Sequence, residues 1–433
     1  MPYAHDLQNK LQSVIEWADL RHEQGVAVDP TLDALRSALD RAADRLQKAR
    51  RPADLADREP DDLVAIRALR PNGPRRLRKG LFADDIGDRM AGAWLGRAAG
   101  CTLGVPVEQW PVDDMEAWAR KCRMAYPPTD YWTDHPTPAR DWYKTNTLGD
   151  YLKGRINAVP VDDDLTYTFL GLRILERFGP DFSTADVAKA WKDWLPMACT
   201  AEEVALRNLK AGVDPYKAAE INNPFQEWIG ADIRSDSWGY AAPGWPERAA
   251  EMAYRDAYLS HRGNGIYGEM FFAAAIAAAF TASNPREALE IGLTEIPKTC
   301  RLYKDIRWAL NHAKKLKGWR DAHDAVAKRF KGMHAVHTNN NACLTVFGLL
   351  LGNMDFTRTI GLTVAMGLDN DCTTATAGSI IGSIIGKSNI PGHWWKPFRN
   401  RSRTYLKGHG MLKNDDIVRR FLAMAKRVHD LGK

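Results

Sequence analysis

Three consecutive carboxylates, Asp162, Asp163 and Asp164, follow Pro160 and open a pattern of apolar residues at helical spacing. One acidic residue is enough to cap a helix, because its side chain accepts hydrogen bonds from the free N–H groups of the first turn. Three anions within one turn repel one another, which raises their pKa values and costs energy unless a cation lies among them. The run therefore favours a cation site, and helix capping is the alternative.

A second acidic segment, residues 369–374, has the sequence Asp-Asn-Asp-Cys-Thr-Thr and leads directly into residues 375–386, which carry no charge. A helix that apolar is expected to be deeply buried. Asp369 and Asp371 at its start, with the hydroxyl of Thr373 behind them, form an oxygen-rich group of the kind that Mg²⁺, Mn²⁺ or Ca²⁺ prefers. An N-cap with a loop aspartate is again the alternative.

A third segment places a small residue at every fourth position from Gly92 to Gly104 and breaks at Pro106. Small residues on one helical stripe let a helix approach its neighbours closely. The break delivers Glu108 to a loop. A glutamate after a helix is usually solvated, so this segment gains its meaning from the other two.

The three segments together resemble the ADP-ribosylglycohydrolase family, whose members include the glycohydrolase that reactivates dinitrogenase reductase. The resemblance covers about residues 84–396 and includes the closing Ile-Pro-Gly-His-Trp at residues 390–394. It implies an all-α fold, an orthogonal helical bundle around a dinuclear metal site. The two divalent cations are expected to be Mg²⁺ or Mn²⁺, with Ca²⁺ as a further candidate.

The resemblance also implies roles for individual residues. Glu108 looks like the family's first-loop glutamate, Asp163 and Asp164 like its aspartate pair, and Asp369 and Asp371 like its late Asp-x-Asp ligands. The expected metal ligands are Asp162, Asp163, Asp164, Asp369, Asp371, Thr373 and Glu108, and the expected catalytic residues are Glu108, Asp163 and Asp369.

Four positions depart from the family pattern. Asp162 stands where the family commonly has Thr, Leu165 replaces a polar residue, Cys101 replaces an Asp at a helix end, and Cys372 stands where Thr or Ser is usual. A thiol is a poor ligand for a hard cation. We therefore expect Thr373 to substitute for Cys372 as a ligand, or one cation to bind more weakly.

A glycine-rich segment, residues 261–270, leads into an alanine-rich helix much as the family's substrate loop leads into its helix. The expected substrate-binding residues of this segment are Asn264, Gly265, Tyr267, Gly268 and Glu269. Its glycines would let backbone N–H groups approach a phosphate or a sugar. Helix capping by Asn264 and Glu269 is the alternative.

The polar run 337–341 precedes another apolar helix, and His337 and Asn340 are expected to reach the same cleft. Turn formation by asparagine explains this run nearly as well. Trp228 is expected to stack on a base or sugar, as is Trp142, because planar aromatic faces often line such sites. Simple packing in the core is the alternative for each tryptophan.

Glycosidic cleavage needs a water delivered to one face of the sugar and a proton supplied to the leaving group. Two cations lower the pKa of such a water and orient sugar hydroxyls, while Glu108 would act as a ligand or as the general base. We therefore expect hydrolysis of an ADP-ribosyl N- or O-glycosidic bond in a small-molecule or ADP-ribosylated substrate. One alternative is a glycoside hydrolase of the same fold acting on a different sugar or nucleoside, which Asp162 and Cys372 favour. The other is a non-catalytic ligand-binding or structural member of the family.

The elements that must position these residues are predicted to be helices. Most periodic segments of residues 81–433 have helical spacing and strand patterns are scarce, so an all-α catalytic domain is expected there. Two stretches, residues 125–160 and 220–265, are rich in Pro, Gly, Asn and Trp and predict long ordered loops that build binding sites.

The N-terminal part of the chain is predicted to be separate. Residues 1–50 carry two apolar stripes at spacings of three and four, which predicts a helical hairpin that packs on the main domain or forms a homo-oligomer contact. Residues 51–80 are rich in Arg and Pro and predict an exposed basic linker. Contact with phosphate is the alternative for its arginines, but isolated charge runs are usually solvated.

The chain of 433 residues has 60 Lys and Arg against 54 Asp and Glu, and the net charge of +6 is spread along its length. This excess is too weak to imply nucleic acid as a partner. The six cysteines form no CxxC pair and no signal peptide is recognised, so a cytoplasmic location is expected. The longest apolar stretches fall short of the about 18 residues that a membrane span needs, so no membrane partner is expected.

Overall fold

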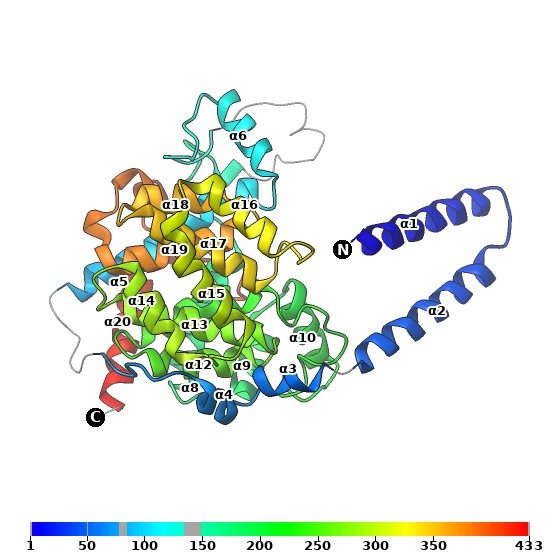
Figure 1. Cartoon of the computed structure of the whole chain (residues 1–433), viewed down its shortest axis with the longest axis horizontal. Coiled ribbons are helices and arrows are strands. Elements are labelled where there is room, and N and C mark those ends of the chain that lie inside the picture. The colour runs from blue at the N-terminus through cyan, green and yellow to red at the C-terminus, as the bar shows by residue number, and fades with distance from the viewer. Residues whose placement is uncertain (1, 50, 78–84, 134–148, 432–433) are drawn as a thin grey trace. The chain divides into compact units, whose positions relative to one another are not determined.

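The computed structural model describes residues 2–49, 51–77, 85–133 and 149–431 (Figure 1). The chain divides into two compact units, the first made of residues 1–57 and 330–334 and the second of residues 58–329 and 335–433. The candidate site residues fall in the second unit, except that Trp142 lies outside the described residues. The expected boundary near residue 80 also lies outside them, within residues 78–84.

The first unit is built on two long helices, α1 (Pro2–Glu23) and α2 (Asp29–Lys48), followed by the short α3 (Ala53–Arg58), which ends at the boundary. Large apolar side chains of both long helices are exposed, with 55% of Leu7, 56% of Trp17 and 77% of Leu46 accessible. Helices occur at both predicted positions. An amphipathic helix normally buries its apolar stripe, so contact of this hairpin with the main domain or with a second copy stays a prediction.

The second unit is helical almost throughout, which confirms the all-α prediction, and the only strands of its described residues are β1 (Arg401–Arg403) and β2 (Met411–Lys413), an antiparallel pair. Its α-helices are α4 (Leu63–Leu69), α5 (Ile86–Gly104), α6 (Val112–Lys121), α8 (Asp163–Phe178), α9 (Thr184–Trp194), α10 (Thr200–Lys210), α11 (Ser235–Ala241), α12 (Pro246–Ala257), α13 (Asn264–Ala279), α14 (Pro285–Gly292), α15 (Arg301–His312), α16 (Trp319–Arg329), α17 (Thr338–Gly352), α18 (Phe356–Ala365), α19 (Asn370–Ile385) and α20 (Asn414–Leu431). Short 3₁₀ turns are η1 (Val105–Val107), η3 (Ile229–Arg234), η4 (Leu293–Glu295), η5 (Ala313–Lys315), η6 (Lys387–Asn389), η7 (Gly392–Trp394) and η8 (Lys396–Phe398).

Helices α5 and α19 lie side by side and pack through glycines (Figure 1). We call this contact the glycine seam; it consists of Gly92, Gly96, Gly100 and Gly104 on α5 and Gly378 and Gly382 on α19. A Cβ atom added to Gly96 would lie 2.3 Å from the carbonyl oxygen of Gly378, and one added to Gly104 would lie 2.2 Å from the Cα atom of Asp371. The backbones therefore touch, and the end of α5 meets the start of α19.

The helices behind the site are buried on all sides. Every residue of α13 is buried, and so is every residue of α19 except the last, Ile385. Their sequences are apolar all round rather than striped, which is the pattern of a helix enclosed by other helices. The predicted burial of residues 375–386 thus holds except at Ile385, which is half-buried.

Residues 220–265 are not a long loop, so that prediction is wrong. They contain η3, α11 and α12. Pro246 stands in the first turn of α12, where a proline fits because its missing N–H would be unpaired there, and buried alanines follow at helical spacing. The Gly and Pro content marks the ends of short helices here. The described part of residues 125–160 does lack α-helices.

Residues 58–77, which we call the strap, are not a solvated linker as the sequence predicts. The Glu59 side chain is fully buried and accepts hydrogen bonds from Arg301 and from Asn264 Nδ2 at 3.0 Å. Arg70 forms ion pairs with Glu295 at 2.6 Å and with Glu247 at 2.5 Å, and Glu295 is only 1% exposed. Charges of the strap are thus paired with charges of the rest of the second unit. Three of its arginines, Arg67, Arg70 and Arg75, form ion pairs with carboxylates.

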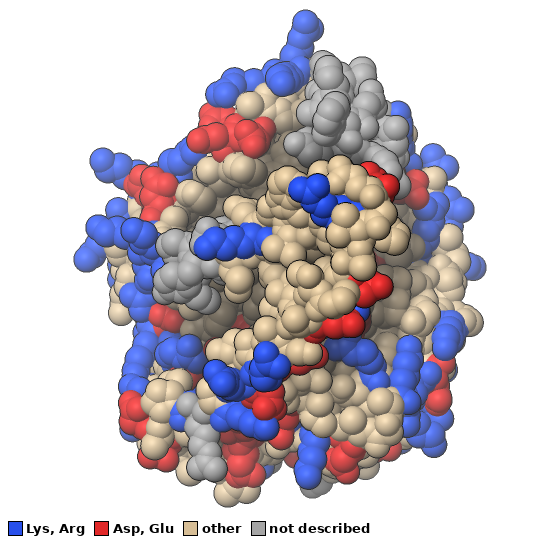
Figure 2. All heavy atoms as spheres, turned by 90° about the vertical axis from the view of Figure 1, so that its right-hand side faces the viewer, with Lys and Arg blue, Asp and Glu red and all other residues tan. Residues whose placement is uncertain are grey.

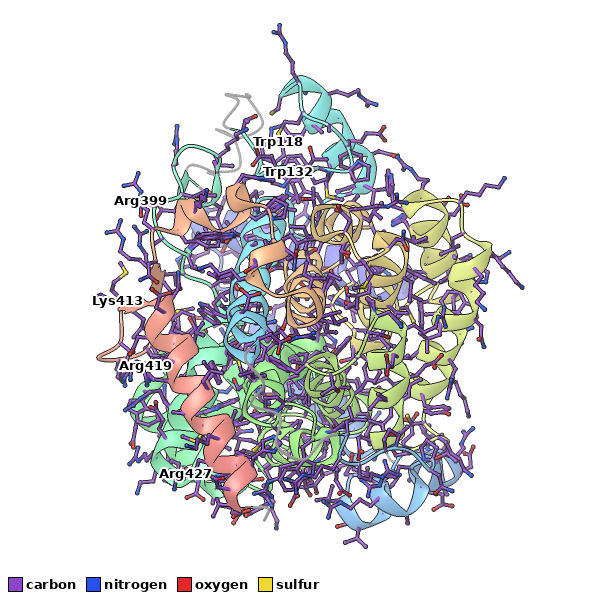
Figure 3. The ribbon with its side chains drawn as sticks, turned by 90° about the vertical axis from the view of Figure 1, so that its left-hand side faces the viewer. Trp118, Trp132, Arg399, Lys413, Arg419 and Arg427 are labelled. Carbon is purple, nitrogen blue, oxygen red and sulfur yellow. The ribbon has the colours of Figure 1, made fainter. Side chains whose placement is uncertain are left out.

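Acidic and basic side chains are interspersed on the face of the molecule shown in Figure 2. The labelled Trp118 and Trp132 lie together in Figure 3, and their rings are stacked with centroids 4.7 Å apart. Within the described residues, no helix combines the length and the apolar character that crossing a membrane requires.

Candidate metal centre

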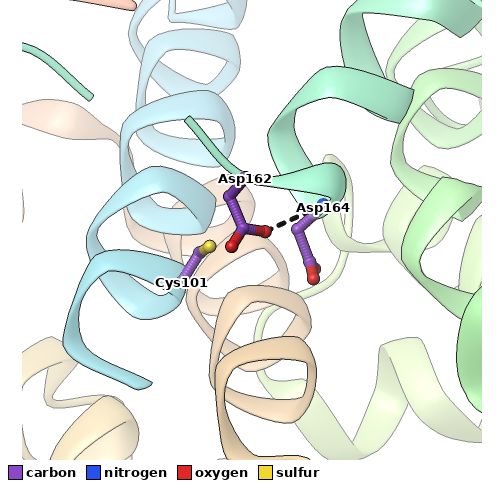
Figure 4. A group of neighbouring side chains, drawn as sticks. All are labelled: Cys101, Asp162 and Asp164. Carbon is purple, nitrogen blue, oxygen red and sulfur yellow. Dashed lines mark hydrogen bonds between the residues drawn. The ribbon is translucent and has the colours of Figure 1, made fainter. Parts of the chain in front are cut away.

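The aspartate run stands at the start of α8. Asp162 is the N-cap, and its Oδ1 accepts from the backbone N–H of Asp164 at 2.9 Å (Figure 4). Asp163 Oδ1 accepts from the same N–H at 3.1 Å. Capping therefore accounts for Asp162. It does not account for the buried carboxylate of Asp164, which takes no part in the cap.

Arg97, an arginine inside the glycine-patterned helix α5, holds the Asp164 carboxylate from behind. Its Nη2 donates to Asp164 Oδ1 at 2.8 Å, and its Nη1 forms an ion pair with Asp236 at 2.8 Å. All three side chains are fully buried. Asp164 Oδ2 is also buried and, among the described residues, has no hydrogen-bond partner. One oxygen is thus fixed by Arg97 and the other is left for a ligand.

The late acidic segment stands at the start of α19. Asp369 is the N-cap residue, yet within the described part of the chain its side chain accepts no capping hydrogen bond. Its backbone N–H donates to Asn341 Oδ1 at 3.2 Å. Asp371 Oδ1 and Thr373 Oγ1 are buried and find no hydrogen-bond partner among the described residues. Helix capping therefore does not explain these side chains.

Glu108 reaches the late segment from the loop after α5 and η1. The next residue, Gln109, donates its backbone N–H to the carbonyl of Leu368 at 3.0 Å, which ties the two loops together. The Glu108 side chain is exposed, whereas Asp369 and Asp371 are each only 4% exposed. The glutamate thus stands at the open side of the group and the two aspartates behind it.

Three groups of side chains bring three candidate ligand atoms to within 4.8 Å of one another. They are Glu108, Asp369 and Asp371; Asp164, Asp371 and Cys372; and Cys101, Asp162 and Asp164. Shared aspartates, Asp371 and Asp164, join the groups into one cluster, which with Asp163 we call the carboxylate centre. Three segments far apart in the sequence meet there. Asp163 belongs to none of the three groups.

Burial and mutual repulsion perturb the carboxylates strongly. Burial and the nearby Glu108 charge raise the pKa of Asp369 to about 7. Burial raises the pKa of Asp164 to about 7 as well, even though Arg97 opposes the shift. The pKa of Asp371 lies well above its ordinary range for the same reasons, burial first and Glu108 second. Partial desolvation and the charge of Asp163 also raise the pKa of Glu108.

This donor set fits divalent cations. Buried carboxylates that lack partners are costly, and a bound cation removes that cost. Carboxylate and hydroxyl oxygens are the ligands that hard divalent cations prefer. Asp164, Asp371 and Thr373 each have a buried side-chain oxygen without a hydrogen-bond partner among the described residues. A bound cation would stabilise these oxygens.

The predicted substrate loop is occupied by contacts within the protein. Asn264 is buried and donates to Glu59 and Glu227, and Tyr267 donates its hydroxyl to the Pro60 carbonyl at 2.5 Å. Glu269 is buried and accepts from Trp238 Nε1 at 2.6 Å. None of these three side chains reaches the surface.

The two glycines of that loop serve close packing. A Cβ atom on Gly265 would lie 2.3 Å from the carbonyl oxygen of Gln226, and one on Gly268 would lie 1.9 Å from Asp232 Oδ1. Their small size is therefore required by neighbouring protein atoms. A role in substrate binding stays a prediction for this loop.

The other predicted wall residues surround the start of α17. His337 is its N-cap and lies 3.5 Å from Glu227, while Asn340 is buried and accepts from the backbone of Asn341. Trp228 is half-buried and pairs with His337 in a single β-bridge. Asn341 connects this region to Asp369, so the α17 start adjoins the carboxylate centre.

One residue that sequence reasoning missed is Asp232 in η3. It is 1% exposed, both of its carboxylate oxygens are buried, and neither has a hydrogen-bond partner in the described part of the chain. Burial raises its pKa well above the ordinary range, and the charge of Asp369 adds to the shift. A carboxylate inside an apolar run, here Ile-Gly-Ala-Asp-Ile at residues 229–233, was the available signal. Arg97 carried a similar signal within its Gly- and Ala-rich helix.

An all-α fold that gathers buried carboxylates from three distant segments defines a class, that of helical proteins with a candidate metal centre. Within that class the chain belongs to the ADP-ribosylglycohydrolase family, because the family model described as ADP-ribosylglycohydrolase matches residues 83–430. The resemblance inferred from the sequence is thereby confirmed. The family implies a hydrolase of the glycohydrolase type, typically dependent on divalent metal ions.

A solved structure described as "ADP-ribosylglycohydrolase-related protein complex" is similar to this chain, with a TM-score of 0.55 and 19% sequence identity. The similarity covers 80% of this chain and 99% of the other. At this identity it supports the fold alone. No curated protein matches the chain.

Proposed function

We propose that this protein is a metal-dependent glycohydrolase that cleaves an ADP-ribosyl N- or O-glycosidic bond. One observation carries the proposal: carboxylates from three distant segments meet in one cluster, and several of their buried oxygens lack partners among the described residues. Membership of the ADP-ribosylglycohydrolase family supports the reaction class.

The ligands of two divalent cations, Mg²⁺ or Mn²⁺ with Ca²⁺ as a further candidate, would be Glu108, Asp162, Asp163, Asp164, Asp369, Asp371 and Thr373. When bound, such cations lower the pKa of a water and orient vicinal sugar hydroxyls. The protein's own part is to hold these side chains before ligand arrives. Arg97 fixes Asp164, and Asn341 fixes the backbone of Asp369.

Glu108 is the residue best suited to move protons. Its carboxylate is exposed beside two buried aspartates, so a substrate can reach it. Its raised pKa brings it closer to the range in which a carboxyl group both accepts and returns a proton near neutral pH. It would accept the proton of the attacking water at a carboxylate oxygen. Asp163 and Asp369 would orient the reacting groups.

A glycohydrolase acting on a different sugar or nucleoside is the second candidate. The observation that favours it is the state of residues 264–269, where Gly268 packs against Asp232 and Tyr267 binds the strap. A loop filled by protein contacts offers less backbone to a diphosphate than the sequence predicts. The substrate panel described next separates the two candidates.

The test combines metal uptake with turnover. Asp369→Ala and Asp163→Ala should abolish both, whereas Asp324→Asn, an exposed aspartate of α16, should retain both. Turnover would be measured on ADP-ribosylated substrates and on a panel of pentosides, hexosides and nucleosides, with Mg²⁺ or Mn²⁺ added after chelation. Full activity in the chelated, metal-free protein would contradict the proposal. A complete lack of response to every metal and sugar would favour a non-catalytic family member.

A further inference from the structure

Two cysteines lie inside the carboxylate centre, one from each helix of the glycine seam. Cys101 on α5 is 1% exposed, and its sulfur groups with oxygens of Asp162 and Asp164 (Figure 4). Cys372 on α19 is 7% exposed, and its sulfur groups with oxygens of Asp164 and Asp371. The two thiols thus flank the same aspartate, Asp164.

The centre therefore contains two kinds of donor group. Glu108, Asp369 and Asp371 offer oxygen alone, whereas Asp164, Asp371 and Cys372 offer two oxygens and one sulfur. Oxygen donors suit Mg²⁺ and Mn²⁺, while a thiolate binds these ions poorly and favours borderline or soft ions such as Zn²⁺. The carboxylate centre thus contains one group that prefers hard cations and another that prefers borderline or soft cations.

In the group of Asp164, Asp371 and Cys372, buried oxygens of the two aspartates indicate a ligand independently of the cysteine. Asp164 Oδ2 and Asp371 Oδ1 are both buried, and within the described residues both lack a hydrogen-bond partner. Other buried cysteines of the chain have backbone partners. Cys343 Sγ donates to the Asp305 carbonyl at 3.5 Å, and Cys300 Sγ accepts from the Tyr303 N–H at 3.3 Å.

We propose that the carboxylate centre holds two unlike cation positions, and that Asp164, Asp371 and Cys372 form one that takes Zn²⁺ in preference to Mg²⁺. The oxygen-only position of Glu108, Asp369 and Asp371 takes Mg²⁺ or Mn²⁺. Binding at the mixed position replaces the S–H bond of Cys372 by a sulfur–metal bond, and the proton passes to solvent. This inference rests on the metal centre of the proposed function and is independent of the sugar.

Cobalt reports directly on sulfur ligation. Co²⁺ added to the chelated full-length protein should give a sulfur-to-cobalt charge-transfer absorption in the near ultraviolet, and Cys372→Ser should lose it. Cys343→Ser, another buried cysteine outside the centre, should retain the absorption. In calorimetric titrations Cys372→Ser should lower the affinity for Zn²⁺ at least about tenfold and change that for Mg²⁺ much less.

A second variant guards against a folding defect. Cys372→Thr supplies a hydroxyl in place of the thiol and should shift the preference from Zn²⁺ toward Mg²⁺, with circular dichroism confirming the fold. No charge-transfer absorption in the unsubstituted protein, or equal Zn²⁺ affinity in it and in both Cys372 variants, would overturn the inference. Loss of the absorption in Cys101→Ser alone would also overturn it. Sulfur ligation without turnover of any glycoside would instead remove the proposed function and leave this inference standing.

Discussion

Asp164 contacts both the buried core of the fold and the candidate metal centre. Through Oδ1 it accepts from Arg97, which also pairs with Asp236, so part of its charge is balanced by the core. Asp164 also belongs to two of the three candidate ligand groups, and its Oδ2 has no hydrogen-bond partner among the described residues. A buried salt bridge rarely adds much stability by itself, because desolvation offsets the Coulomb attraction. We infer that Arg97 mainly orients the Asp164 carboxylate.

The carboxylates make the stability of the metal-free protein depend on pH. The pKa values of Asp164 and Asp369 are about 7 in the folded protein, against about 4 in an unfolded chain, so folding favours their protonated forms. Their contribution is fully present below about pH 4 and is lost as the pH rises through about 7. We therefore expect the free energy of unfolding to fall between about pH 5 and pH 7, by up to about 1.4 kcal/mol per pH unit for each group.

Denaturant unfolding at several pH values in the presence of a chelator measures this slope, and added Mn²⁺ should make it shallower. The Asp369→Asn variant should show a shallower slope. The slope should not vanish, because Glu202 has a pKa raised to about 7 by burial and adds in the same direction. Greater stability of the metal-free protein at pH 7 than at pH 5 would contradict the assignment.

At the scale of the elements, the glycine seam fixes the distance between two ligand sets. Glu108 follows α5, and Asp369 and Asp371 begin α19, so the packing of these two helices sets how far apart their carboxylates lie. The contact is backbone against backbone at Gly96 and Gly378. Such a contact leaves no side chain that could yield to an added atom.

Alanine substitutions at Gly96 and Gly87, two glycines of α5 with different surroundings, should therefore affect the stability of the protein differently. Gly96→Ala places a methyl group 2.3 Å from the Gly378 carbonyl oxygen, and we expect it to destabilise the protein by about 1–3 kcal/mol and to weaken metal binding. Gly87→Ala, in the first turn of the same helix, meets its nearest atom at 4.0 Å and should be neutral or stabilise by up to about 1 kcal/mol, because alanine favours a helix. Thermal unfolding of both variants tests the pair, and equal effects would contradict the packing argument.

The elements differ in how far the sequence alone predicts them. The sequence predicts the burial of residues 375–386 and of the alanine-rich residues 271–280, because a run without charge is expected to be enclosed by other helices. The short helices α11 and α12 do not, since Gly, Pro and Trp at their ends resemble loop composition. Among site residues, Asp369 and Asp371 stand out by their position before an apolar helix. Asp232 is harder to predict, because the only local signal is a carboxylate within the apolar run 229–233 and its burial depends on tertiary packing.

At the scale of the whole molecule, the N-terminal residues fall into two groups that belong to different units. Residues 1–57 belong to the first unit, whereas residues 58–77 belong to the second unit and contact its other residues through Glu59, Arg70 and Arg75. The matched family segment begins only at residue 83, so the strap lies before it. The bounds of the N-terminal hairpin and of the catalytic domain stay a prediction, as does self-association through residues 1–50.

Two truncations separate these roles. Removing residues 1–57 should leave the thermal unfolding midpoint nearly unchanged, and light scattering of the same protein shows whether its mass falls to that of a monomer. Removing residues 1–77 takes away the partners of Glu295, which is buried, and should lower the midpoint by at least about 5 °C. An unchanged midpoint after the longer truncation would contradict a structural role for the strap. Glu59→Ala in the full chain should lower the midpoint in the same direction.

The glycine seam also limits how this protein can diverge. Residues that never touch a ligand usually drift freely over evolutionary time, as long as they keep the core filled. Each seam glycine instead abuts the main chain of the opposite helix, and Gly104 abuts Asp371 itself. A larger residue on one side would displace the carboxylates of α19 relative to Glu108. The seam glycines should therefore tolerate substitution as poorly as the aspartates that they hold in place.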